Sequence, residues 1–109
     1  MEINRGDLII VALAGDYGKP RPALVVQSNA FREVPSVTVL PLSGDLQKAP
    51  LVRITVEPRS GTGLAKRSQV MIDKAATVQR IKIGQRIGRA DSGTMRAVDT
   101  ALASFLGLH

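Results

Sequence analysis

The sequence contains no cysteine and no tryptophan, and its single histidine is the last of 109 residues. The absence of cysteine excludes a disulfide framework and a thiolate metal site, and one histidine leaves few imidazole ligands for zinc or haem. The nine acidic residues occur singly, without the spacing that metal ligands require. We therefore expect no metal and no other cofactor.

Aromatic residues make up 3% of the chain, so platforms for base stacking would be sparse and the core must be aliphatic. The longest apolar run, Leu8–Ala14, is far shorter than the roughly 18 residues that a membrane span needs. No basic segment of an export signal precedes it. The length suits one domain over residues 1–109. We expect a soluble cytoplasmic protein without a membrane partner.

The net charge of +6 is concentrated in one part of the chain. From Lys48 to Ala90 the sequence holds ten basic and two acidic residues, a local net charge of +8, whereas the remainder carries −2. Such a segment is typical of a surface that binds a polyanion, because each neutralised phosphate releases counterions. The alternative is an ordinary solvated surface. The clustering favours the polyanion.

Short apolar segments separated by turn-forming residues predict a mainly β fold. The alternation in "VTVLPL" and "VRITV" favours half-buried antiparallel strands, and Gly84 and Gly88 indicate a bulge in a curved sheet. The final segment has a helical period, with Asp91 or Ser92 as the N-cap and Gly107 at the end. We therefore predict a small antiparallel barrel with one C-terminal helix. The predicted strands are Leu8–Leu13, Ala23–Gln27, Val37–Leu42, Val52–Val56, Ser68–Ile72 and Val78–Ile83, and the apolar stripe of the helix is Met95, Val98, Leu102 and Leu106.

Polar residues beside the predicted strands are the candidates for chemistry. Arg21 begins "RPALVVQS", Ser43 follows "VTVLPL", and Asp16 lies in the loop before Arg21. If the second and third strands are antiparallel neighbours, Arg21 and Ser43 share one end of the sheet, where both can donate to phosphate oxygens. An ion pair of Arg21 with Asp16 or Asp45, and a turn started by Ser43, would explain these residues without a function. The spacing alone favours this structural interpretation.

Five segments resemble, in order and spacing, the MazF/PemK family of toxin endoribonucleases. They are "RGDLIIVAL", "RPALVVQS", "VTVLPLS", "GLAKRSQVMIDKAATVQRI" and "VDTALASFLGL", and together they cover nearly the whole chain. The resemblance implies an SH3-like barrel with a terminal helix, a homodimer, and cleavage of single-stranded RNA at short sequence motifs. It also implies a cognate antitoxin, which we expect to be an acidic, partly disordered protein because the RNA groove is basic.

The resemblance also implies roles for individual residues. The arginine of the family's "RP" motif corresponds to Arg21, its hydroxyl residue to Ser43, and an acidic residue that assists in some members to Asp16. Lys74 stands where a glutamine often follows the aspartate matched by Asp73, and we expect this difference to change surface charge only. The residues predicted to contact RNA are Lys19, Lys48, Arg53, Lys66 and Arg67.

The implied reaction is attack of the 2′-hydroxyl on the adjacent phosphorus, without a metal ion. Arg21 would stabilise the added negative charge and donate a proton late, since a guanidinium is a poor base, and Ser43 would donate to a phosphate oxygen. Two other function classes fit the same fold or charge: a CcdB-like toxin that binds DNA gyrase and cuts nothing, and a non-catalytic RNA-binding barrel. The arginine of "RP" and the hydroxyl after "PL" favour the ribonuclease.

Overall fold

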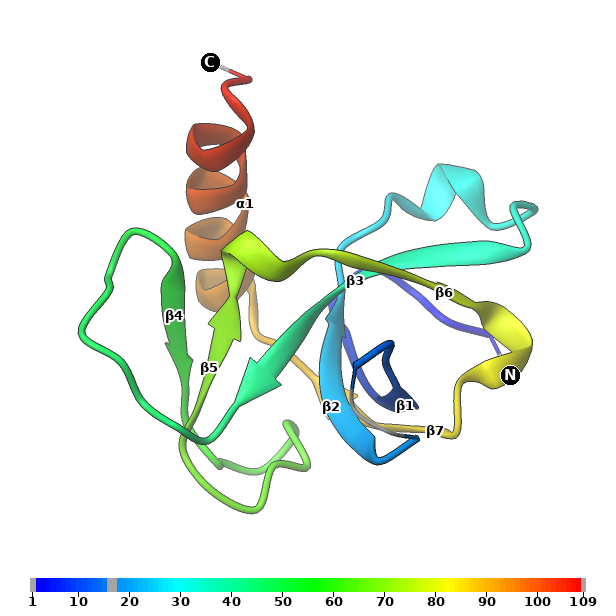
Figure 1. Cartoon of the computed structure of the whole chain (residues 1–109), viewed down its shortest axis with the longest axis horizontal. Helices are drawn as coiled ribbons and strands as arrows, with labels where there is room; N and C mark the ends of the chain where they lie inside the picture. Colours follow the sequence, from blue (N-terminus) through cyan, green and yellow to red (C-terminus); the bar gives the residue numbers. More distant parts are fainter. Residues whose placement is uncertain (1, 16–17, 109) are drawn as a thin grey trace.

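The computed structural model describes residues 2–15 and 18–108, which form seven strands and one α-helix (Figure 1). The strands are β1 (Asp7–Ala12), β2 (Pro20–Val25), β3 (Ser36–Ser43), β4 (Arg53–Val56), β5 (Ser68–Met71), β6 (Ala76–Gln79) and β7 (Gln85–Arg89). Three short 3-10 helices are η1 (Asn29–Phe31), η2 (Ile72–Lys74) and η3 (Arg80–Lys82), and the α-helix is α1 (Ser92–Leu106).

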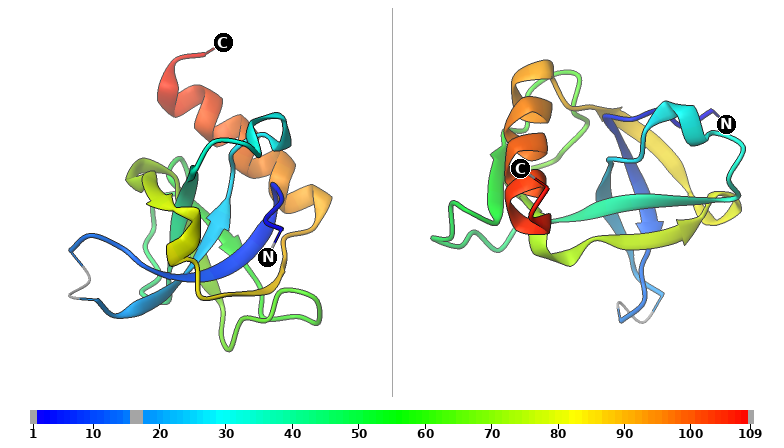
Figure 2. Two further views of the ribbon diagram at one scale, coloured as in Figure 1. Left: turned by 90° about the vertical axis from the view of Figure 1, so that its right-hand side faces the viewer. Right: turned by 90° about the horizontal axis from the view of Figure 1, so that it is seen from above.

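The strands form a curled antiparallel sheet in the order β4-β5-β3-β2-β1-β7, with β6 paired to β3. The sheet makes a half-barrel, and α1 stands beside β4 and β5 (Figures 1 and 2). The predicted small antiparallel barrel with a C-terminal helix is therefore confirmed. No helix within the described ranges is long and apolar enough to cross a membrane.

Two apolar cores lie on opposite faces of the central strands, because successive side chains of a strand point to opposite sides. One core contains Leu8, Leu24 and Leu40 and is covered by α1 through Val98. The second core is smaller and faces away from α1, with β6 packed against it. Its buried members are Ile3, Ile9, Val11, Ala23, Val25, Val37 and Val39.

The apolar stripe of α1 agrees with the prediction except at its end. Val98 is fully buried, and Met95 and Leu102 pack against the core that α1 covers. Leu106 is exposed, because the last turn of α1 extends past the sheet (Figure 1). The helix begins after Asp91, one of the two predicted N-caps, whose carboxylate accepts a hydrogen bond from a backbone N–H in the first turn.

The strand predicted at Val78–Ile83 is wrong beyond Gln79, because the chain leaves the sheet at the end of β6 and turns through η3. Arg80 accounts for the turn. Its backbone N–H donates to Pro35 O at 2.9 Å, and its guanidinium donates to the carbonyls of Phe31 and Val34. These bonds attach η3 to the loop before β3. The last strand, β7, therefore forms only after Gly84 and pairs with β1.

Asp7, the first residue of β1, has no exposed surface. Its carboxylate accepts hydrogen bonds from the backbone N–H of Asn4 at 2.8 Å and from the guanidinium of Arg89 in β7, and Arg86 lies 3.9 Å away. A buried carboxylate without such partners would cost several kcal/mol. The ion pair therefore ties β1 to β7 at one edge of the sheet.

Two glycines allow the loop between β4 and β5 to cross over β7. Gly88 lies at a shift in the pairing of β7 with β1, so the predicted bulge is confirmed. A Cβ on Gly88 would lie 2.3 Å from the carbonyl oxygen of Gly61, and a Cβ on Gly63 would lie 2.0 Å from that of Ile87. Both contacts are with backbone, which cannot rotate away. The crossing therefore requires glycine at both positions.

We expect Gly88→Ala to lower the free energy of unfolding by about 3 kcal/mol, because the new methyl group overpacks a backbone crossing. Gly93→Ala is the matched control, since a Cβ in the first turn of α1 meets only ordinary contacts. The control should be neutral or slightly stabilising. Urea denaturation followed by circular dichroism measures both. Equal stability of Gly88→Ala and the unaltered protein would contradict the crossing.

Candidate active site

The candidate site begins where β3 loses one of its two neighbours. The pairing of β3 with β2 ends at Pro41 and Ala23, while the last two residues of β3 pair with β5 on its other edge. Neither Pro22 nor Pro41 has an N–H to continue the ladder between β2 and β3. Continued by two residues, the register of these strands would set Arg21 opposite Ser43. The separation of the two strands therefore opens a gap between these side chains.

A cavity of about 430 Å³ lies at this end of β3, lined by residues from both sides of the strand. Arg21 and Ser43 each lie two residues beyond a member of the central ladder, so their side chains point to the face of the second core. The structure thus brings Arg21 and Ser43 to one cavity, while Asp16 lies outside the described residues. The full lining is Leu13, Ala14, Arg21, Pro41, Leu42, Ser43, Met71, Lys74, Ala76, Thr77 and Val78.

The Ser43 hydroxyl is already oriented by the backbone. Its Oγ accepts a hydrogen bond from the backbone N–H of Asp45 at 3.1 Å, which confirms the turn that the structural interpretation anticipates. A serine hydroxyl that accepts one bond keeps its hydrogen for donation. The turn and a donor role toward a substrate oxygen are therefore compatible.

Lys74 lines the cavity together with Arg21 and Ser43. The side chain of Lys74 is exposed, and η2 places it at the rim of this cavity, so the surface charge that it adds lies beside the candidate site. Its ammonium lies 3.9 Å from the carboxylate of Asp73, and Asp73 accepts a hydrogen bond from Arg53. The sequence signal was present, since Lys74 directly follows a predicted strand and an aspartate.

Arg53 has a side chain only 12% exposed, and it is held by Asp73 and by the carbonyl of Val52. Desolvation of Asp73 would raise the pKa of its carboxyl, but hydrogen bonds from Arg53 and the backbone and the charges of Arg53 and Lys74 hold that pKa below its ordinary value of 3.8. The carboxyl of Asp73 is therefore ionised at neutral pH, beside the cavity. The structure holds Arg53 in this ion pair, and its contact with RNA stays a prediction.

The other residues predicted to contact RNA lie on exposed loops. The side chain of Lys66 lies over Gly44, the residue that follows Ser43 in the sequence. A Cβ on Gly44 would be 2.3 Å from the Cε of Lys66. Arg67 pairs with Glu57 at 3.0 Å, with more than half of its side chain exposed. Lys19 is exposed just before β2, and Lys48 is exposed in the loop between β3 and β4.

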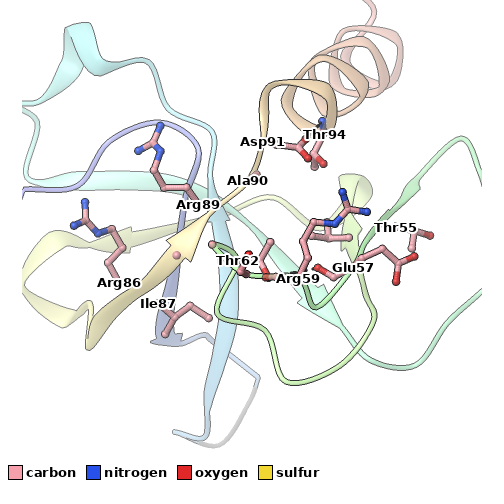
Figure 3. A pocket seen from close by; sticks show the side chains of 14 residues that line it. Thr55, Glu57, Arg59, Thr62, Arg86, Ile87, Arg89, Ala90, Asp91 and Thr94 are labelled. Atoms are coloured by element: carbon pink, nitrogen blue, oxygen red, sulfur yellow. Dashed lines mark hydrogen bonds between the residues drawn. The ribbon is translucent and has the colours of Figure 1, made fainter.

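A larger cavity of about 770 Å³ lies between the loop after β4, β7 and the start of α1 (Figure 3). None of the predicted site residues that the structure describes lines it. Arg86 and Arg89 point away from Glu57 and Arg59 in Figure 3, toward buried Asp7. The arginines that line this larger cavity therefore do not converge on one point. Among the described residues, no three His, Cys, Asp or Glu side chains gather in a way that could hold a metal ion.

The lowered pKa of Asp73 predicts how its contribution to stability depends on pH. Because the pKa falls on folding, the contribution is present above 3.8 and is lost as the pH falls through the folded value. The free energy of unfolding of Asp73→Asn should therefore be lower than that of the unaltered protein by a constant amount from about pH 8 to about pH 5. This difference should shrink as the pH falls below the ordinary pKa of the carboxyl. Urea denaturation over this pH range measures it. A difference that persists at the acid end would contradict the ion pair.

Comparison with known proteins places this geometry in a family. The profile of the PemK-like, MazF-like toxins of type II toxin–antitoxin systems matches residues 4–106. A probable endoribonuclease MazF of Mycolicibacterium smegmatis is 44% identical over 107 residues, which cover 97% of this chain and 98% of that protein.

Solved structures agree with this match. An endoribonuclease from Mycobacterial species, in complex with its cognate antitoxin, superposes with a TM-score of 0.82 at 26% identity, over 98% of this chain and 97% of that one. The Mycobacterium tuberculosis toxin MazF-mt6 has the same fold, with a TM-score of 0.80 at 23% identity over 94% and 98% of the two chains. This chain belongs to the PemK-like, MazF-like toxin family of type II toxin–antitoxin systems.

Proposed function

We propose that this protein is a toxin endoribonuclease that cleaves single-stranded RNA at short sequence motifs and so inhibits translation and growth. The observation that carries the proposal is the shared cavity of Arg21 and Ser43, which come from two strands that separate at this point. The relative from Mycolicibacterium smegmatis, named as a probable endoribonuclease, supports the reaction class.

The reaction is intramolecular attack of the substrate's own 2′-hydroxyl on the adjacent phosphorus. The O2′–P bond forms, the bond from phosphorus to the 5′-oxygen breaks, and the 2′-hydroxyl proton passes to solvent water. Negative charge grows on the phosphate oxygens in the transition state. Arg21 stabilises that charge with its fork of N–H donors and supplies a proton to the leaving 5′-oxygen late in the reaction. Ser43 donates its hydroxyl hydrogen to a second phosphate oxygen.

Lys74 brings a second positive charge to the same cavity. Its ammonium stands at the edge of the gap beside Asp73, within reach of a nucleotide that enters between β2 and β3. An ammonium donates hydrogen bonds and accepts none, so it favours phosphate or base acceptors. Lys66 and Lys48 extend this positive surface toward the neighbouring nucleotides.

In this proposal the protein is a cytoplasmic homodimer that binds a cognate antitoxin. The local net charge of +8 attracts an acidic, partly disordered chain that competes with RNA. A solved relative held in complex with its cognate antitoxin supports this partner. A second copy would widen the basic groove so that RNA crosses both subunits. Light scattering that shows only monomer at micromolar concentration would contradict the dimer.

Cleavage should continue undiminished in excess EDTA, because the guanidinium and hydroxyl donors carry the charge stabilisation. The products should bear a 2′,3′-cyclic phosphate and a 5′-hydroxyl. A single 2′-deoxy nucleotide at the cut should block cleavage and leave binding nearly intact. Mass spectrometry of fragments from a long single-stranded RNA measures the ends and maps the motif. Binding without cleavage would indicate a non-catalytic RNA-binding protein, and gyrase-dependent DNA breaks would indicate the gyrase class.

Arg21→Ala and Ser43→Ala should each lower kcat about a hundredfold to a thousandfold, because each removes one donor to the transition state. RNA binding and the fold should be retained. Ser43→Thr is the matched control for the hydroxyl and should keep most of the activity. Arg96→Ala controls for the loss of an arginine, since Arg96 lies on α1 away from the cavity. Full activity of Arg21→Ala in a single-turnover assay would overturn the proposed mechanism.

A further inference from the structure

The side chain of Gln69 holds the loop that follows Ser43. Its Oε1 accepts a hydrogen bond from the backbone N–H of Gln47 at 2.9 Å, and its Nε2 donates to the carbonyl oxygen of the same residue at 3.1 Å. One side-chain amide thus pairs with a backbone amide as a neighbouring strand would. Gln69 is only 7% exposed, so these two bonds satisfy a buried polar group.

Gln69 is also the direct cross-strand partner of Ser43, because β3 and β5 pair in the register Ser43 with Gln69. Directly opposed residues have side chains on the same face of a sheet, only a few ångströms apart. Leu42 and Val70, the next pair, point to the opposite face into the core under α1. The core under α1 requires apolar side chains only on the face of β5 that carries Val70. Gln69 lies on the other face, where a polar side chain is allowed.

A chain of contacts leads from Gln69 back to the Ser43 hydroxyl. Gln69 fixes the backbone at Gln47, and two residues earlier the N–H of Asp45 donates to Ser43 Oγ at 3.1 Å. The far end of the loop is closed separately, by hydrogen bonds from Val52 and Arg53 to the carbonyl of Ala49. The short turn that orients Ser43 thus lies between β3 and the point held by Gln69.

We propose that Gln69 is a positioning residue of the candidate active site, which keeps residues 44–47 in the turn that aims the Ser43 hydroxyl into the cavity. The proposal rests on the proposed function, because it assigns the purpose of this turn to catalysis. Gln69 does not line the cavity, so it acts on the substrate only through Ser43. An apolar residue of similar volume would preserve the strand, since the exposed backbone of Gln47 can pair with water.

The test is a double-mutant cycle between Gln69→Leu and Ser43→Ala, with single-turnover cleavage of one RNA oligonucleotide as the assay. Gln69→Leu alone should lower kcat about tenfold to a hundredfold and leave KM within about twofold, because a loosened turn misaims the hydroxyl. In the Ser43→Ala background the same substitution should have no further effect. An equal loss in both backgrounds, or no loss in the first, would overturn the proposal.

Gln79→Leu is the matched control, because it makes the same change at an exposed position of β6 that does not line the cavity. It should retain wild-type kcat. Amide hydrogen exchange supplies a readout that needs no RNA: the N–H groups of Asp45 and Gln47 should be protected in the unaltered protein and exchange faster in Gln69→Leu. Unchanged protection in Gln69→Leu would overturn the proposal. If the unaltered protein cleaves no RNA while protection is lost in the variant, the proposed function fails and the hold of Gln69 on the Ser43 turn stands.

Discussion

After Pro41, β3 no longer pairs with β2, although on its other edge it still pairs with β5. Proline has no N–H, so Pro22 and Pro41 cannot extend the hydrogen-bonded ladder between β2 and β3. The two strand ends therefore separate, and Arg21 and Ser43 lie at these ends. The cavity that they share, with η2 as a further wall, depends on this separation.

Two buried or half-buried carboxylates stabilise the frame around that gap. Asp7 ties β1 to β7 through Arg89, and Asp73 ties η2 to β4 through Arg53. Both arginines belong to the basic segment of the chain, so part of its charge serves the fold and does not face a ligand. Net charge therefore overstates the positive surface, and Lys66 and Lys74 are the basic residues that the structure brings near the candidate site.

The amino-acid sequence was informative where the chemistry follows from strand position. Strand position brought Arg21 and Ser43 together only if their strands are antiparallel neighbours, and the resemblance to the MazF/PemK family distinguished them from an ordinary ion pair and turn. Lys74 was not among the predicted site residues, and its direction depends on a single turn of 3-10 helix. Gln69 was not among them either, since a glutamine in a strand is usually solvent-facing, whereas its amide is buried against the loop after Ser43.

The sequence by itself determined the first five strands and the helix, the aliphatic character of both cores and the glycines and caps at the turns, because these depend on periodicity and local backbone preference. It did not determine the end of β6 or the existence of β7, since the long-range hydrogen bonds of Arg80 end β6. Only the tertiary structure decided which cations remain available and which polar groups hold the Ser43 turn. Ion pairs and cross-strand partners join residues far apart in the chain, and their choice depends on register and curvature.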